Sequence, residues 1–169
     1  MTGPAVEPFV PRLASAADLS AWCRVFGDGQ GEMSGGAPSA AGLAEYLLAE
    51  QQPVMRWAVR AGSGVISGVA ELRPAEQGPE VGFLRLYVAR SARRHGLGAA
   101  LLARVVADAV ASGSERLRAT VPAGGPGEPF ARGCSGQRVV LRLERQDQRL
   151  DREGVLDRCR ALAVCPDPA

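Results

Sequence analysis

Residues 80–113, EVGFLRLYVARSARRHGLGAALLARVVADAVASG, predict a strand, a loop and a helix in succession. Residues 81–88 are almost wholly apolar and rich in β-branched and aromatic types, which is typical of a strand buried on both faces. From Gly98 onward the apolar residues recur at helical spacing, with charged residues on the other side. Ser112 and Gly113 predict the end of the helix, because glycine adopts the left-handed conformation there without steric cost.

The loop between this strand and this helix has the composition of a phosphate-binding turn. Gly96 and Gly98 remove side chains where the backbone enters the helix, so several unpaired N–H groups can point outward at the positive end of the helix dipole. The nucleotide P-loop is excluded, because it needs a lysine and the chain contains none. The dinucleotide turn also fits poorly, since it needs a third glycine and an acidic residue after the next strand.

A third phosphate-binding turn fits best. Val88, then Arg93-x-x-Gly96-x-Gly98, then Ala-Ala-Leu-Leu resembles the acetyl-CoA signature of the GNAT superfamily of N-acyltransferases, in which a strand precedes R/Q-x-x-G-x-G/A and a helix. The resemblance implies that N–H groups of residues 94–99 hold the pyrophosphate of acetyl-CoA, and that backbone groups of residues 86–88 pair with its pantetheine arm. The cofactor-binding residues implied are Leu86, Tyr87, Val88, Arg93, Arg94, His95, Gly96, Leu97, Gly98 and Ala99.

Two positions of the loop depart from the family pattern. Arg90 stands where the family often has proline, and Arg94 where it often has glycine. Neither change removes the two glycines that the geometry requires. The alternative interpretation is an ordinary glycine-containing turn in a glycine-rich chain.

The composition indicates one domain without metal or disulfide crosslinks. A chain of 169 residues is long enough for a proper core, and its net charge of +2 is nearly balanced. The cysteines show neither CxxC spacing nor a histidine cluster, which disfavours zinc and a disulfide framework and favours a reducing cytosol; they are Cys23, Cys134, Cys159 and Cys165. With no long apolar run and no signal-peptide pattern, we expect a cytoplasmic protein that does not enter a membrane.

The rest of the chain predicts the elements around this motif. In order they are a strand at 9–13, a helix capped by Ser15, a mobile loop at 27–40, a helix at 41–51, strands at 54–60 and 64–72, and a turn at 74–79. The order is also that of GNAT folds. The resemblance therefore implies an α+β fold, with a mostly antiparallel six- to seven-stranded sheet flanked by helices and with strands four and five parallel and splayed around the thioester.

The final third resembles the family less. A fifth strand is expected at 116–121 and a last one at 137–143, but the segment between them lacks the asparagine and the tyrosine that the family often has there. Phe130 is the nearest match to the tyrosine that protonates the thiolate, and it has no proton to give. Residues 1–145 would form the acyl-CoA-binding domain. Residues 146–169 would form a C-terminal amphipathic helix and tail, docked on its own core or on a second subunit as in a homodimer, or resembling the connector of tandem GNAT proteins.

Candidate groups for proton transfer are few. Amide formation from a thioester needs a neutral amine, donors for the oxyanion and a proton acceptor. Glu71 and Glu80 can act through water, or can lie in solvent or pair with an arginine. Tyr87 can donate a proton but fits a core position, and Cys134 is either a weak acid or a small buried residue. The catalytic residues are thus unknown from the sequence.

The basic residues suggest anion binding. Arg85 interrupts an apolar strand, where a charge is costly unless it is paired or faces a cavity, so it can hold an acidic acceptor or a neighbouring glutamate. The run of Arg85, Arg90, Arg93 and Arg94 suits nucleic acid poorly, because the net charge is near zero and aromatic residues are not interleaved. His95 is the only histidine, so a Ser/His/Asp hydrolase would have to draw its base from the phosphate loop.

The sequence therefore predicts an N-acetyltransferase that moves an acetyl group from acetyl-CoA to a primary amine, with no metal and no nucleic-acid partner. The acceptor is left open, since the family sets its choice in segments that are 27–52 and 122–136 here. The alternative is a non-catalytic acyl-CoA-binding or dimerisation module with a degenerate active site.

Overall fold

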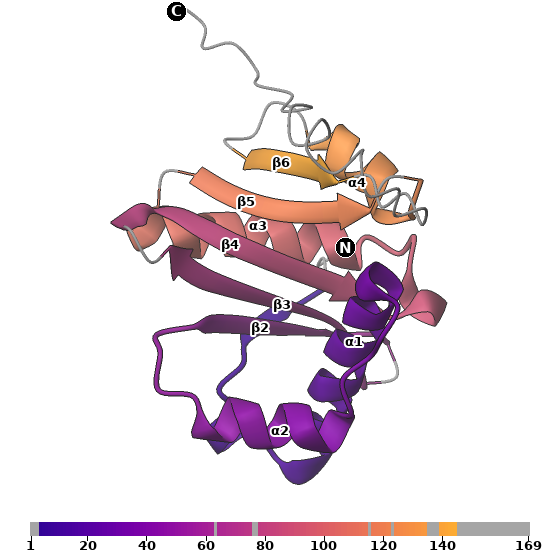
Figure 1. The fold of residues 1–169 in the computed structure, drawn as a ribbon. Coiled ribbons are helices and arrows are strands. Elements are labelled where there is room, and N and C mark those ends of the chain that lie inside the picture. The colour runs from indigo at the N-terminus through magenta and orange to yellow at the C-terminus, as the bar shows by residue number, and fades with distance from the viewer. Residues whose placement is uncertain are drawn as a thin grey trace, which may run out of the picture.

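The strands of the protein form one mixed sheet (Figure 1). The computed structural model describes residues 4–62, 64–75, 78–114, 116–122, 124–134 and 139–144. Within these residues the sheet has six strands, which lie side by side in chain order: β1 (Val6–Pro8), β2 (Met55–Arg60), β3 (Ile66–Ala75), β4 (Gly78–Val88), β5 (Arg116–Pro122) and β6 (Val139–Glu144). Neighbours from β1 to β4 are antiparallel, whereas β4, β5 and β6 run parallel. The predicted α+β class and the parallel fourth and fifth strands are confirmed.

Helices cover both faces of this sheet (Figure 1). They are α1 (Ala16–Ser34), α2 (Ala40–Ala49), α3 (Leu97–Ala111) and the short α4 (Gly127–Gly133). Side chains alternate across the sheet, so Leu72 and Leu84 share a buried cluster with Leu101 of α3, while Val69 shares another with Trp22 of α1. No helix in the described part of the chain is long and apolar enough to cross a membrane. The tail predicted at 146–169, and any seventh strand formed after residue 144, lie outside the described residues.

The prediction of a mobile loop at 27–40 is wrong, because α1 continues as a helix to Ser34. Its glycines disfavour a helix locally, but the helix needs one of them to pack closely on β4. A Cβ atom on Gly29 would lie only 2.2 Å from Cγ of Tyr87. One turn earlier, Phe26 stacks on Trp22 and meets the Tyr87 ring edge-on. Tertiary contacts thus hold a segment that looks flexible in sequence, and only residues 35–39 between the two helices are irregular.

Two further expectations about strands are corrected. Residues 11–13 form a 3-10 helix instead of strand, since Pro11 has no N–H for a ladder and favours a helical turn, and the strand lies earlier, in β1. β4 is not buried on both faces: Phe83 is 46% exposed and the Arg85 side chain 47% exposed. The Ser15 cap is confirmed, because its hydroxyl accepts a hydrogen bond from the N–H of Asp18. The glycine stop is also confirmed by the φ of 84° at Gly113.

We expect Gly29→Ala to lower the free energy of unfolding. The forced shift of the Tyr87 ring or of α1 should cost about 2–3 kcal/mol, which outweighs the gain of about 1 kcal/mol that alanine gives a helix. Denaturant unfolding measures the difference. Gly133→Ala is the control, because the added Cβ meets no described atom within 4 Å and should be neutral or slightly stabilising. A Gly29→Ala protein as stable as the original would contradict this packing of α1 on β4.

Candidate active site

The pairing between β4 and β5 stops partway along both strands. Three residue pairs join them, from Val81–Arg116 to Phe83–Arg118. Beyond Phe83, residues 84–88 of β4 pair with β3 but have no partner on β5 within the described residues. The predicted pantetheine-binding residues Leu86, Tyr87 and Val88 all lie in this half-paired stretch. A strand with one free edge can accept an extended ligand as an added strand.

The loop that follows β4 turns sharply into α3. A 3-10 turn at Arg90–Ala92 comes first, and both Arg94 (φ 67°) and Gly96 (φ 79°) adopt left-handed conformations. Gly96 is the N-cap of α3. The N–H groups of residues 96–99 donate no backbone hydrogen bond within the described part of the chain, whereas the next one, of Ala100, bonds to the Gly96 carbonyl. The loop therefore brings the predicted glycines together at a helix N-terminus with four N–H donors available.

A carboxylate from α1 holds this loop in place, a contact that no sequence pattern predicted. Glu32 accepts hydrogen bonds from Arg90 Nε (2.6 Å) and from an Arg93 terminal nitrogen (2.7 Å), while Arg93 Nε also donates to the Val88 carbonyl (3.0 Å). Burial opposes ionisation of Glu32, but these hydrogen bonds outweigh it and hold its pKa below the ordinary value. The helical spacing of Trp22, Phe26 and Met33 was the available signal that α1 reaches this far.

Two exposed residues of the loop, Arg94 and His95, make few contacts with the rest of the protein. The Nδ1–H of His95 donates to the Arg93 carbonyl at 2.8 Å, which leaves Nε2 of this exposed imidazole free of hydrogen bonds among the described residues. Arg94 is exposed and makes no ion pair within the described part of the chain. Both residues can therefore meet an anion bound at the loop.

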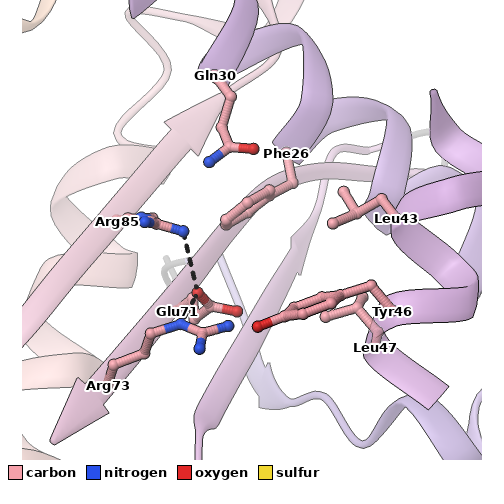
Figure 2. Close-up of a pocket in the computed structure, with 8 residues that line it drawn as sticks. All are labelled: Phe26, Gln30, Leu43, Tyr46, Leu47, Glu71, Arg73 and Arg85. Atoms are coloured by element: carbon pink, nitrogen blue, oxygen red, sulfur yellow. Dashed lines mark hydrogen bonds and ion pairs between the residues drawn. The ribbon is translucent and has the colours of Figure 1, made fainter. Parts of the chain in front are cut away.

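A pocket of about 230 Å³ lies on the opposite face of the sheet from α3 (Figure 2). Apolar and aromatic side chains of α1 and α2 form one wall, and charged side chains of β3 and β4 form the other. The lining residues are Phe26, Gln30, Leu43, Tyr46, Leu47, Glu71, Arg73 and Arg85. The pocket thus reaches the half-paired stretch of β4 at Arg85.

Glu71, a candidate base, is buried in a network of ion pairs on this charged wall. One of its oxygens accepts a hydrogen bond from Arg56 Nε (2.9 Å) and the other accepts one from Arg73 Nε (2.8 Å). Glu50, at the end of α2, also pairs with Arg56 and Arg73. Burial opposes ionisation of Glu50, but its two arginine partners outweigh it and lower its pKa. The reading of Glu71 as an arginine partner is confirmed, and the side chain of Glu80 lies outside the described ones.

Arg85 has the weakest ties of the arginines around Glu71. Its nearest charged partner in the described residues is a Glu71 oxygen at 3.7 Å, beyond hydrogen-bond distance, and nearly half of the side chain is exposed (Figure 2). A guanidinium has five N–H donors in a planar fork. Arg85 can therefore still bind an anion that enters the pocket.

The remaining candidates for proton transfer, Tyr87 and Cys134, do not line the pocket. The Tyr87 hydroxyl lies 3.4 Å from Sδ of Met33, in the packing against α1, and burial raises its pKa. The thiol of Cys134 donates to the Phe130 carbonyl at 3.2 Å, and burial raises its pKa as well. Both fit the core interpretation. The described residues contain no group of three or more metal ligands.

Comparison with known proteins relates this arrangement to a family. The model of the Acetyltransferase (GNAT) family matches residues 23–127, which include α2, α3, β2 to β5 and most of α1. No curated protein sequence is similar enough to match the chain.

Several solved structures share the fold. That of yncA from Salmonella typhimurium, with its cofactor acetyl-CoA, has a TM-score of 0.62 at 16% identity, over 80% of this chain and 79% of that one. The ribosomal-protein-alanine N-acetyltransferase of Brucella melitensis has a TM-score of 0.62 at 21% identity, over 78% and 83%. An N-acetyltransferase from Staphylococcus aureus Mu50 has a TM-score of 0.62 at 17% identity, over 78% and 81%.

We expect Arg94→Gly to be more stable than Arg94→Ala by about 1 kcal/mol. Both changes remove the same charge, but only glycine relieves the left-handed backbone at this position. At residues with negative φ the order is reversed, because glycine loses more conformational entropy on folding. Thermal unfolding of the two variants gives the difference. An alanine variant that equals or exceeds the glycine variant would contradict the φ of 67°.

Low pH should weaken the ion pairs of Glu50. A carboxyl group with a depressed folded-state pKa contributes stability above its unfolded pKa, near 4.3, and loses this contribution as the pH falls through the folded value. We expect Glu50→Gln to cost about 3 kcal/mol at neutral pH and to cost progressively less as the pH falls below about 4.

Denaturant unfolding across this pH range tests the expectation. The exposed Glu45 of α2 provides the control, since Glu45→Gln breaks no ion pair within the described residues. A gap between wild type and Glu50→Gln that is independent of pH would show that the Glu50 charge contributes nothing to stability.

Proposed function

Because the chain belongs to the GNAT acetyltransferase family, we propose that it transfers an acetyl group from acetyl-CoA to a primary amine. One observation carries the proposal. A helix N-terminus with four available N–H groups follows, after a short loop, a strand whose residues 84–88 have no partner on the β5 side within the described residues. Such a site has places for both the phosphate end and the extended arm of a coenzyme A thioester.

The residues of the loop fit the pyrophosphate. The N–H groups of residues 96–99 would donate to its oxygens, and Gly98 has no side chain that could cover them. Arg90, Arg93 and Arg94 add positive charge to the loop. Glu32 would then share Arg90 and Arg93 with the phosphates. The structure of yncA, which contains acetyl-CoA in a similar fold, supports acetyl-CoA as the ligand.

The free edge of β4 suits the pantetheine arm. Backbone groups of residues 86–88 would pair with its amides as β5 pairs with the start of the strand. The Val88 carbonyl already accepts a hydrogen bond from Arg93, so the loop and the edge are linked. This arrangement would bring the thioester next to the part of β4 that carries Arg85.

Bound acetyl-CoA supplies an activated carbonyl group. A neutral amine nitrogen attacks the carbonyl carbon, the C–N bond forms and the C–S bond breaks. The nitrogen loses one proton and the departing thiolate gains one, so the products are an amide and a free thiol. The protein residues hold and orient the two reactants, which by itself supplies a large part of a rate acceleration. We assign no proton-transfer residue, because Glu71 is paired and Tyr87 packs against α1.

Calorimetric titration with acetyl-CoA, followed by thiol release with a panel of amines, tests the function. We expect micromolar binding and turnover of at least one amine. Binding without turnover of any amine would favour the non-catalytic acyl-CoA-binding module. An absence of binding would mean that the motif is only a structural turn.

Gly98→Glu tests the loop assignment. A carboxylate beside the N–H groups of residues 96–99 should repel and obstruct the pyrophosphate, so we expect the affinity for acetyl-CoA to fall roughly 100-fold or more. Gly98→Ala is the matched control, since its Cβ makes only ordinary contacts with Phe130 and Val88, and its affinity should change far less. Circular dichroism should show both variants folded. Unchanged affinity in a folded Gly98→Glu protein would overturn the loop assignment.

A further inference from the structure

The ion-pair network that includes the charged wall of the pocket has an excess of positive charge. In it two carboxylates, Glu50 and Glu71, face three guanidinium groups, those of Arg56, Arg73 and Arg85. Both oxygens of Glu71 already accept hydrogen bonds from Arg56 and Arg73. The unbalanced charge is therefore that of Arg85, whose donors have no hydrogen-bonded acceptor within the described residues.

Arg85 also lies where an acceptor would meet the thioester. On β4 it comes two residues after Phe83, the last residue that pairs with β5, and directly before the predicted pantetheine-binding residues 86–88. Its side chain extends into the pocket on the α1 side, with the Gln30 amide on the same side (Figure 2). An anion bound to the Arg85 side chain would thus lie close to the free edge of β4.

The size and the walls of the pocket limit what this anion belongs to. A volume of about 230 Å³ is below the usual range for drug-sized ligands, so the ligand is small. Phe26, Leu43 and Leu47 make the opposite wall apolar, while Arg85 offers the fork geometry that matches a carboxylate with two parallel hydrogen bonds. An apolar body, an amine and a carboxylate within a small volume describe an amino acid.

We propose that the acceptor is an amino-acid-sized amine with an apolar side chain and a carboxylate, and that Arg85 binds this carboxylate. The inference rests on the proposed function. The carboxylate would neutralise the unbalanced guanidinium, and the apolar side chain would lie against α1 and α2. Glu71 keeps its other arginines when the carboxylate binds, so the protein network need not rearrange.

Matched pairs of acceptors test the proposal. Thiol release is measured at one pH with leucine, methionine and phenylalanine, and with the corresponding amino-acid amides, which keep the amine and the side chain but lose the negative charge. We expect kcat/KM to be higher for the acids by roughly tenfold or more, chiefly through KM. The amide amine is less basic and more of it is neutral, so this bias works against the expectation.

Arg85→Gln should remove the preference. We expect the KM of the acids to rise roughly tenfold or more, with the KM of the amides and of acetyl-CoA unchanged. Arg85→Lys should restore part of the preference, because it keeps the charge without the fork. Arg118→Gln is the matched control, since Arg118 is an exposed arginine on β5 outside the pocket, and the preference should persist. Amides used as well as acids, or a preference that survives in Arg85→Gln, would overturn the proposal.

A binding experiment distinguishes a failure of this inference from a failure of the proposed function. Turnover of uncharged amines only would leave the acetyltransferase function standing and overturn the role of Arg85. If no amine releases thiol, the proposed function fails, and calorimetric titration of the protein with coenzyme A plus each acid or amide decides the role of Arg85. Binding of acids alone, lost in Arg85→Gln, would support the carboxylate site, and equal or absent binding of acids and amides would overturn it.

Discussion

The backbone hydrogen bonds between β4 and β5 end at the Phe83–Arg118 pair, and the rest of the site depends on where they end. A longer ladder would satisfy the outer edge of β4 and leave no strand edge for a ligand. Because the ladder stops early, β4 is paired on one side only as it approaches the loop and the N-terminus of α3. Strand edge and helix terminus are therefore adjacent in the chain, and one extended ligand with a phosphate at its end can engage both.

The charge network on the other face of the sheet explains what this site can hold. A buried carboxylate such as Glu71 is costly unless its oxygens are hydrogen-bonded, and Arg56 and Arg73 supply those bonds from β2 and from β3 itself. The same pairing occupies both oxygens of Glu71 with hydrogen bonds from arginines. Glu71 thus organises the arginines, and Arg85 is the member of the set that is turned toward the ligand space.

Local chemistry and tertiary contacts account for what the sequence could and could not predict. The strand, loop and helix around Gly96 were predictable from local sequence. Glycine permits the left-handed conformation at the N-cap, and the apolar residues that follow recur at helical spacing. The second half of α1 was not predictable, because Gly29 lowers the intrinsic stability of the helix. Its advantage, close packing against Tyr87, appears only in the folded structure. Because the second half of α1 was not predicted, its hydrogen bonds from Glu32 to Arg90 and Arg93 of the loop were not predicted either. The partial pairing of Arg85 depends on the register of β3 with β4, which no local pattern specifies.

The absence of a proton donor at Phe130 bears on how such a site would work. With no phenol at that position, and with Tyr87 directed into the packing of α1, acetyl transfer would depend mainly on how well amine and thioester are oriented. Orientation improves when the acceptor is held at two points, and an apolar wall alone gives only one. A carboxylate held by Arg85 would supply the second, fixing the amine relative to the free edge of β4. An active site without a proton donor would therefore gain more rate from a charged group that fixes its acceptor than an active site with one would.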